Sequence, residues 1–372
     1  MRIAYIALRG IPLSDGIVQY TDDIARRLTQ MGHEITVYTS KRYGNKTGLY
    51  DHCYNIITIP SLPFGFAEKM SIVLMASLHQ LFCNYDVVHY HAMGPSIFAF
   101  IGKLSGKVTV IQSHGVEYER AKHSKLTRKI LYLMEKYSIN MGDELLVCSN
   151  ALYDHFMHEY GKKTRVIHNA VNIPENLTCD REYLEEYGLA EGEYYLFMAR
   201  LTVEKCLHHL IKAFKKLKTD KKLVIAGPID PNNSYHQKLK EMSKNDTRII
   251  FIGFVTGKKK ENLLKGCYAF CLPSELEGFS MALLEAMGYE KCCITSDIPN
   301  NIEAVGETGI SFHTNNVKDL YYALLEAENN PEEVEELGIA ARKRAKENFS
   351  WDIIAKETEL MYVELLKEKY RK

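Results

Sequence analysis

Two glutamates, Glu277 and Glu285, carry the strongest chemical signal in this sequence. They lie eight residues apart, and a small-residue turn between them leads into an apolar, helix-forming run. On one α-helix they would be separated by roughly 12 Å, at ~1.5 Å of rise per residue. That distance is too long for the carboxylates to share one proton or one small ion. It suits the two ends of an extended ligand such as a nucleotide sugar, so the spacing predicts an enzyme that binds one.

Two cations, Arg200 and Lys205, follow a predicted strand at 194–199. Lys205 is expected to open the next helix, whose first turn offers free backbone N–H groups and the positive end of the helix dipole. Two cations at such a position would neutralise the charge that develops on a diphosphate leaving group. A solvated surface pair is the alternative interpretation, and the glutamate motif in the same half of the chain favours the binding role.

Three further positions are predicted to face the ligand. Gly16 ends the turn at 10–16, where glycine lets backbone amides approach a ligand closely. His114 terminates a strand and should face the same cleft, although a histidine at a strand end is usually structural. Val255 lies in the segment 253–258, whose glycine spacing is one residue short of a Walker A loop. We interpret that segment as a strand end whose backbone borders a nucleobase.

His89 and His91 alternate onto one face of a predicted strand at 86–90. No nearby carboxylate completes a set of metal ligands, so we interpret the two histidines as core packing or as support for the site. No metal site is predicted.

The elements that must position these residues form a strand–helix alternation that occurs twice. Apolar, β-branched runs predict strands at 2–8, 34–39, 86–90, 108–113 and 144–148, and again at 194–199, 222–227, 248–252, 268–272 and 292–295. Helices are predicted at 19–31, 204–218, 234–244, 279–289 and 317–328. This order predicts an α/β fold with two Rossmann-like, doubly wound parallel sheets. Ligands bind such sheets at the carboxyl ends of the strands, so the cleft between the domains is the expected site.

The domain boundary is predicted at about 170–176, which gives an N-terminal domain at 1–170 and a C-terminal domain at 171–351. The last segment, about 352–372, reads as one long amphipathic helix that could pack back on the first domain. Residues 70–85 carry no charge but contain several polar residues, and they read as a core helix rather than a membrane span.

The composition narrows the class of protein further. The 372 residues include 47 Lys+Arg and 47 Asp+Glu, so no global charge favours nucleic acid as a partner. The nine cysteines show no CxxC and no zinc-finger spacing, which favours reduced thiols and a cytoplasmic protein. The apolar N-terminus lacks a cleavage site and reads as a buried strand.

The motifs together resemble those of retaining, GT-B-fold glycosyltransferases of family four. The resemblance rests on the segment 200–205, on the PS..EGF element at 273–279 and on the Glu-x7-Glu spacing. It runs nearly end to end, because the segments 9–12, 91–96, 114–122 and 296–299 are similar to a bacterial, rhamnosyltransferase-like subgroup of polysaccharide assembly in the cell envelope. The chain departs from that pattern at Asp15-Gly16, where the family often has paired glycines, and at Ala170, where glycine is commoner.

The resemblance implies a role for each candidate residue. Arg200 and Lys205 would bind the donor diphosphate, and Glu285 would accept hydrogen bonds from the ribose. Glu277 would hold the donor sugar, helped by backbone N–H groups of Gly278, Phe279 and Ser280. Gly16 would lie near the phosphates, and His114 near the transferred sugar and the reacting bond.

The same resemblance implies the reaction and its partners. The sequence contains no Asp-x-Asp metal-diphosphate motif, so a metal-independent transfer without a cofactor is predicted. The donor is a nucleotide sugar, with a UDP-sugar favoured, and the acceptor is a glycan or a lipid-linked saccharide. Retention could proceed by front-face attack, in which the leaving phosphate oxygen helps to deprotonate the acceptor hydroxyl. Alternatives left open are a GT-B nucleotide-sugar epimerase, a non-catalytic nucleotide-sugar sensor and, more distantly, a Rossmann oxidoreductase.

One local feature bears on the acceptor. The stretch 120–134 contains five basic residues and no acidic residue, and leucine and isoleucine are interleaved with the charges. A basic amphipathic stretch favours anionic lipid headgroups, and a merely solvated helix face is the alternative. The membrane interpretation would place the protein on the inner face of the cell membrane and would favour a lipid-linked acceptor.

Overall fold

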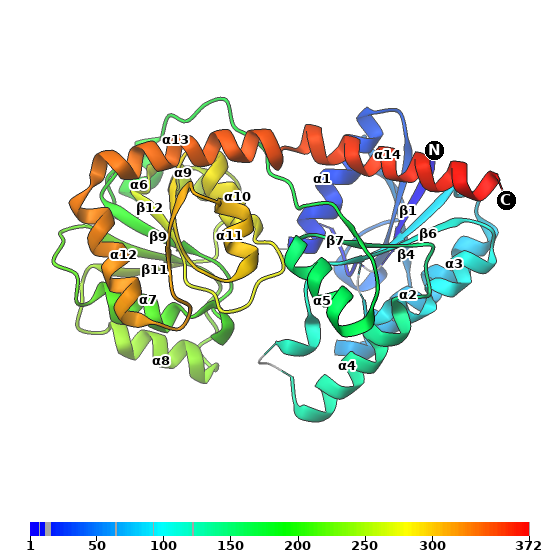
Figure 1. Cartoon of the computed structure of the whole chain (residues 1–372), viewed down its shortest axis with the longest axis horizontal. Helices are drawn as coiled ribbons and strands as arrows, with labels where there is room; N and C mark the ends of the chain where they lie inside the picture. Colours follow the sequence, from blue (N-terminus) through cyan, green and yellow to red (C-terminus); the bar gives the residue numbers. More distant parts are fainter. Residues whose placement is uncertain (7, 12–15, 64, 92, 121–122, 372) are drawn as a thin grey trace. The chain divides into compact units, whose positions relative to one another are not determined.

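The chain folds as two compact units, shown in Figure 1. The computed structural model describes residues 1–6, 8–11, 16–63, 65–91, 93–120 and 123–371. Unit 1 comprises Met1–Ala170 and Trp351–Lys372, and unit 2 comprises Val171–Ser350. Pro12 to Asp15, Ala92 and Lys122 belong to segments singled out above and lie outside the described residues.

Unit 1 is built on a parallel sheet with one antiparallel edge strand. The strands lie in the order β3-β4-β2-β1-β5-β6-β7-β8, and only β3 runs antiparallel to its neighbour among the described strands. Their bounds are β1 Arg2–Ile6, β2 Glu34–Ser40, β3 Gly48–Tyr50, β4 Tyr54–Ile59, β5 Val87–Tyr90, β6 Val108–Ser113, β7 Glu144–Val147 and β8 Arg165–Val166.

The helices of unit 1 lie on both faces of this sheet. Their bounds are α1 Gly16–Gln30, α2 Gly65–His79, α3 Phe100–Leu104, α4 Lys125–Ser138, α5 Asn150–Tyr160 and α14 Trp351–Tyr370, with short 3₁₀ turns η1 Lys41–Tyr43, η2 Gln80–Phe82, η3 Pro95–Ala99 and η4 Glu117–Glu119. Helix α14 contacts α1 and β6, and Figure 1 shows it alongside α1. Its buried Trp351, Ile354 and Tyr362 join the apolar core over β1.

Unit 2 repeats the architecture with a fully parallel sheet in the order β11-β10-β9-β12-β13-β14. The strands are β9 Tyr194–Met198, β10 Lys222–Ala226, β11 Ile249–Gly253, β12 Ala269–Leu272, β13 Cys292–Ser296 and β14 Gly309–Phe312. The helices are α6 Arg181–Glu185, α7 Leu207–Phe214, α8 Ser234–Ser243, α9 Gly257–Gly266, α10 Met281–Gly288, α11 Pro299–Val305, α12 Val317–Asn329 and α13 Pro331–Asn348, with the 3₁₀ turn η5 Val203–Lys205.

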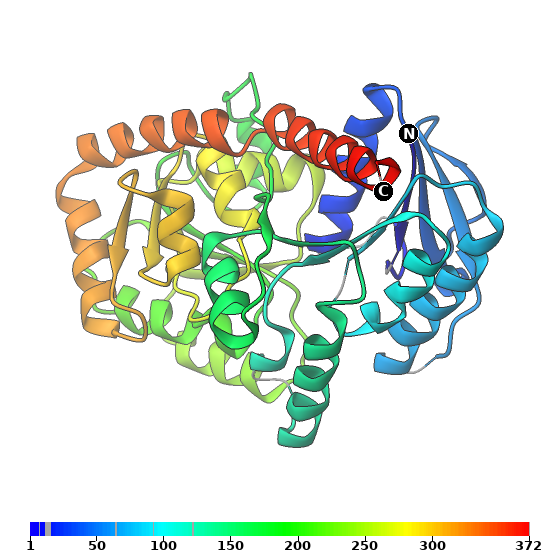
Figure 2. The ribbon, with the colours of Figure 1, turned by 45° about the vertical axis from the view of Figure 1, so that its right-hand side comes forward.

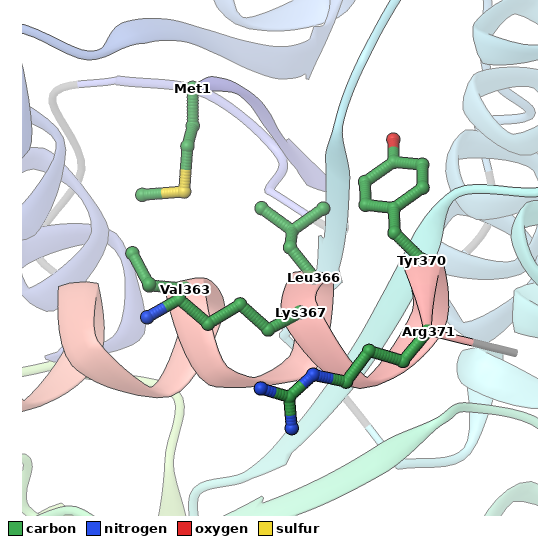
Figure 3. Close-up of a pocket in the computed structure, with 6 residues that line it drawn as sticks. All are labelled: Met1, Val363, Leu366, Lys367, Tyr370 and Arg371. Atoms are coloured by element: carbon green, nitrogen blue, oxygen red, sulfur yellow. The ribbon is translucent and has the colours of Figure 1, made fainter.

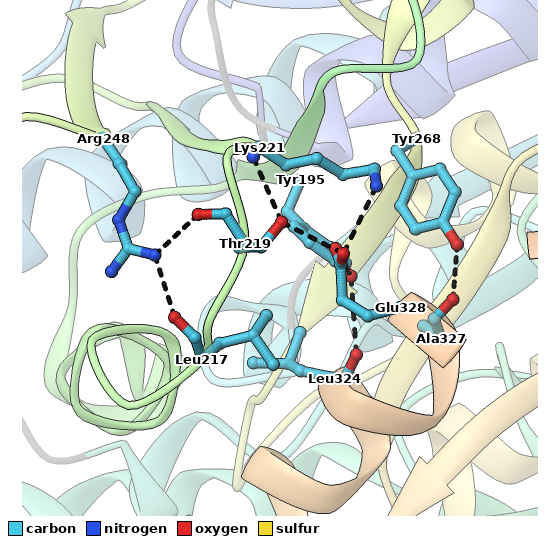
Figure 4. A network of polar contacts seen from close by, with 9 residues as sticks. All are labelled: Tyr195, Leu217, Thr219, Lys221, Arg248, Tyr268, Leu324, Ala327 and Glu328. Carbon is cyan, nitrogen blue, oxygen red and sulfur yellow. Dashed lines mark hydrogen bonds and ion pairs between the residues drawn. The ribbon is translucent and has the colours of Figure 1, made fainter. Parts of the chain in front are cut away.

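A polar network fixes the amino end of the central strand of unit 2 (Figure 4). Glu328 accepts hydrogen bonds from the Tyr195 hydroxyl at 2.7 Å and from Thr219 at 3.0 Å, and pairs with Lys221 at 3.4 Å. Tyr195 is the second residue of β9. The network therefore lies at the opposite end of the sheet from the loops that follow the strands, where a ligand site is expected.

The α/β, doubly wound fold class predicted from the sequence is confirmed, because both units carry parallel sheets with the ligand-binding topology expected for it. Each of the ten predicted strands corresponds to a strand of the structure, while β3, β4, β8 and β14 were not predicted.

One predicted helix needs correction. The helix predicted at 204–218 is interrupted: Lys205 donates its backbone N–H to Thr202 in a 3₁₀ turn, Cys206 is left-handed at φ 51°, and α7 begins only at Leu207. Residues 70–85, predicted as a core helix rather than a membrane span, lie largely in α2 and η2. Helix α2 and η2 bury one face against the unit and expose the side chains of Met75, Leu78, Leu81 and Phe82.

Candidate functional site

The strand order of unit 2 reverses beside β9. The chain runs from β9 outward through β10 to β11, and then returns to place β12 on the other side of β9. The loops after β9 and β12 therefore leave the sheet at a topological switch point, which is where open parallel sheets bind ligands. These two loops contain Arg200, Lys205 and Glu277, three of the residues singled out in the sequence.

The structure brings Lys205 and Glu277 into direct contact. Lys205 Nζ lies 2.5 Å from Glu277 Oε1, and the two side chains are only 13% and 8% exposed. The backbone joins the same loops, because the Glu275 N–H donates to the Glu204 carbonyl at 2.9 Å. The attraction within a mostly buried ion pair is stronger than within a surface pair, and a ligand that enters here meets a positioned cation and carboxylate side by side.

Glu285 has a cationic partner that sequence reasoning missed. It lies on α10, and Lys260 Nζ on α9 is 2.7 Å from its Oε1. The two side chains are partly buried, so water screens the attraction between them only in part. The available signal was the run Lys258–Lys260, which begins at the last residue of the segment 253–258 already assigned to the ligand site.

The turn between the two glutamates is held from several sides. Asn300 donates its side-chain amide to the Glu277 carbonyl at 2.5 Å, and the Ser280 hydroxyl accepts the Leu283 N–H at 3.4 Å as the cap of α10. Phe279 is buried and meets Phe349 edge to face, with ring centroids 5.3 Å apart. Gly278, which lies between Glu277 and Phe279 in the sequence, is half-buried. Glu277 therefore projects from a rigid turn rather than from the helix on which Glu285 lies.

Arg200 and Val255 differ in their exposure. Arg200 is exposed, and its guanidinium forms no ion pair with any residue that the structure describes. It is thus available to an anionic ligand. Val255 is buried after β11, in a loop bracketed by Gly253 and Gly257, which both have positive φ. Its side chain packs inward, so only its backbone could border a ligand.

In unit 1 the strand order reverses between β1 and β5, and His91 and His114 directly follow β5 and β6. His114 is half-buried, and its Nε2 lies 3.1 Å from His91 Nδ1. Gly16 is the exposed first residue of α1. His89 and His91 are buried as predicted, and burial lowers the pKa of His89 to about 3.

Other features of the structure bear on ligands and location. Among the described residues no cluster of three or more His, Cys, Asp or Glu side chains could hold a metal ion, and no described helix is long and apolar enough to cross a bilayer. The nine cysteines form no disulfide in the described part of the chain.

A pocket of 390 Å³ lies where the end of α14 meets Met1 (Figure 3). Its lining is apolar apart from Lys367 and Arg371, and Met1 precedes β1 at the amino edge of the sheet. The pocket contains none of the predicted site residues and lies away from the strand ends that bind ligands in this fold.

Two family models match the chain. Residues 14–174 match "Glycosyltransferase Family 4", and residues 181–344 match "Glycosyl transferases group 1". Together they cover most of both units.

Individual proteins are similar over most or nearly all of the chain. An uncharacterized glycosyltransferase of Methanocaldococcus jannaschii is 26% identical over 383 residues, covering 97% of this chain and 98% of that protein. The capsular polysaccharide biosynthesis glycosyltransferase CapM of Staphylococcus aureus is 25% identical over 288 residues, covering 73% and 74%.

Solved structures share the fold. Sucrose-phosphate synthase from Thermosynechococcus elongatus superimposes with a TM-score of 0.85 at 18% identity, covering 99% of this chain and 100% of that one. Anabaena HepE in complex with UDP and glucose gives a TM-score of 0.81 at 18% identity, covering 98% and 100%.

Proposed function

We propose that this chain, whose two halves match glycosyltransferase family models, is a GT-B glycosyltransferase that moves a sugar from a nucleoside-diphosphate sugar to a hydroxyl of a glycan or lipid-linked acceptor, with retention of anomeric configuration. The observation that carries this proposal is the partly buried Lys205–Glu277 pair at the switch point of unit 2. It offers a cation for a phosphate and a carboxylate for sugar hydroxyls within one contact.

The second pair, Lys260 with Glu285, extends the site toward the nucleoside. In this proposal Glu285 accepts hydrogen bonds from the ribose hydroxyls, and Lys260 orients that carboxylate. Arg200 adds a second cation for the diphosphate, and the backbone at Val255 borders the base. A UDP-sugar is the favoured donor, which is supported by the UDP complexes of the similarly folded HepE.

The proposed reaction needs no metal, because Arg200 and Lys205 supply the positive charge that the departing diphosphate requires. The bond between the anomeric carbon and the phosphate oxygen breaks, and a bond from the acceptor oxygen forms on the same face. The acceptor proton passes to the leaving phosphate oxygen. Glu277 and the backbone N–H groups at 278–280 hold the sugar hydroxyls, while His114 and Gly16 act from unit 1.

The proposal is tested by ligand screening followed by a transfer assay. UDP-, GDP- and dTDP-sugars are compared by thermal shift, because a ligand at 100 times its Kd stabilises the native state by about 2.7 kcal/mol. The selected donor is then incubated with and without glycan acceptors, and released nucleotide is measured. Nucleotide release without any acceptor would favour an epimerase, and binding without turnover would favour a sensor.

We expect Glu285→Ala to raise the donor KM roughly 10–100-fold with kcat little changed. Hydrogen bonds to a charged group contribute about 1.5–3 kcal/mol, and a ribose contact acts equally in the ground and transition states. Steady-state kinetics with the selected donor measure both constants. Glu285→Gln, which keeps the shape and loses the charge, is the matched control and should fall between wild type and alanine. A large fall in kcat at saturating donor would contradict the ribose role.

The proposed acceptor class is supported by the outer face of α4, which Figure 2 shows projecting from unit 1. Four apolar side chains at helical spacing are exposed: Leu126, Ile130, Leu133 and Tyr137. Exposed Lys125, Arg128 and Lys129 accompany them, while Glu135 of the same helix is buried. An apolar stripe with basic flanks and an inward carboxylate fits an anionic bilayer surface.

We expect Lys125→Glu/Lys129→Glu to weaken binding to anionic vesicles roughly 30-fold or more, since each basic residue near such a surface contributes about 1 kcal/mol. Co-sedimentation with vesicles of phosphatidylglycerol and phosphatidylcholine measures the partition. Lys244→Glu, an exposed charge change in unit 2, is the control. Partition that ignores salt and anionic lipid would remove the membrane from the proposal and leave soluble glycans as acceptors.

A further inference from the structure

A chain of buried side chains connects α14 to His114 inside unit 1. The Tyr362 hydroxyl of α14 lies 2.6 Å from His89 Nδ1 and 3.1 Å from the Tyr5 hydroxyl. The His89 ring stacks on His91, with centroids 4.5 Å apart and planes 15° apart. His91 Nδ1 in turn lies 3.1 Å from His114 Nε2. Residues from three distant parts of the sequence therefore converge behind one candidate catalytic histidine.

The His91 ring has little freedom to rotate or to charge. It is 1% exposed, and Tyr5 and Tyr20 contact it at centroid distances of 5.1 and 5.9 Å. Burial, with His89 and His114 nearby, holds the pKa of His91 well below its ordinary value of 6.5. The ring is thus a neutral group with a single proton that must sit on one of two nitrogens.

The partners of those nitrogens decide where the proton sits. His91 Nε2 is buried and has no hydrogen-bond partner among the described residues, whereas Nδ1 faces His114. An unpaired buried N–H is rarer in proteins than an unpaired acceptor. The proton therefore belongs on Nδ1, from which it is donated to His114 Nε2. A neutral His114 that accepts at Nε2 must carry its own proton on Nδ1.

We propose that His91 is a positioning residue that fixes His114 in the Nδ1–H tautomer, and that His89 and Tyr362 of α14 hold His91 in place. The role rests on the proposed function, because an N–H at Nδ1 is a donor suited to an oxygen of the transferred sugar or its leaving group. The last helix thereby contributes to the chemistry of unit 1 through packing and hydrogen bonds rather than by touching substrate.

The tautomer is read directly by long-range ¹H–¹⁵N spectra of the full-length protein labelled at histidine, without any nucleotide sugar. A His114→Gln spectrum identifies the His114 signals by their loss. The expected result is a protonated Nδ1 and an unprotonated Nε2 in the wild type. His114 protonated at Nε2 would overturn the inference, whatever the protein proves to transfer. Absence of any transfer activity would sink the proposed function and leave these spectra unchanged.

Matched variants separate positioning from folding. His91→Phe keeps the ring and removes the donor, so we expect His114 to shift toward the Nε2–H form and kcat to fall about tenfold, the effect of one hydrogen bond. His91→Asn places an amide N–H near the position of Nδ1 and should restore both the tautomer and most of the rate. A His91→Phe enzyme with an unchanged tautomer, or a folded His91→Asn enzyme no better than phenylalanine, would contradict the proposal.

Discussion

Lys205→Ala is expected to lower kcat roughly 10²–10³-fold at saturating donor, the scale of losing one donor to charge that develops in the transition state. In the structure Lys205 is held against Glu277 at 2.5 Å and is mostly buried. Its charge is therefore positioned before a ligand arrives, and it acts in a partly desolvated loop where a cation stabilises a leaving diphosphate more than it would in water. Nucleotide release under steady-state conditions measures the change.

The contact with Glu277 dictates the controls for that prediction. Removing Lys205 alone leaves a mostly buried carboxylate without its partner, which costs stability as well as activity. Lys205→Ala combined with Glu277→Gln removes the unpaired charge, so its melting temperature should recover while its kcat does not. Lys205→Arg keeps the charge but not the point-like ammonium, and should retain only part of the rate. A purified Lys205→Ala enzyme with wild-type kcat would remove Lys205 from the mechanism.

Some of the strands that sequence reasoning missed differ physically from those that it found. Strands such as β9 and β12 are buried on both faces, so they read as continuous apolar runs that periodicity detects. The missed β8 has two residues, and β14 begins at Gly309 and keeps an exposed Ser311. Short edge strands carry little of the apolar signal, and tertiary pairing rather than local preference forms them.

The candidate site shows the same division between local and non-local information. Motif spacing singled out Lys205 and Glu277 separately, but their contact depends on β12 lying next to β9, which no local pattern encodes. The left-handed conformation of Cys206 could not be predicted from its residue type, because cysteine has no preference for it. The start of α7 was therefore predicted too early. Lys260 of α9 and Glu285 of α10 lie 25 residues apart in the sequence, and their contact depends on where the fold places the two helices.

A glycine at the end of β10 supports the loop that carries Arg200. Ala199 donates its N–H to Ala226 at 3.1 Å, and the Gly227 N–H donates to Gly253 at 2.8 Å. A Cβ atom on Gly227 would lie well under 3.0 Å from the Ala199 carbonyl oxygen. Backbone cannot yield as a flexible side chain does, so any larger residue here must push apart the strand ends beneath the site.

Gly227→Ala is accordingly expected to lower kcat/KM about 100-fold, since a displacement near 1 Å of a positioned group costs on that order. The same overpacking should destabilise unit 2 by roughly 1–3 kcal/mol. Kinetics with the selected donor and thermal unfolding measure the two effects. Gly94→Ala is the control: its Cβ would lie 3.8 Å from the nearest atom of the described residues, so the substitution should change neither quantity. Wild-type kcat/KM together with a wild-type melting temperature in Gly227→Ala would show that the ends of β9 and β10 do not position Arg200.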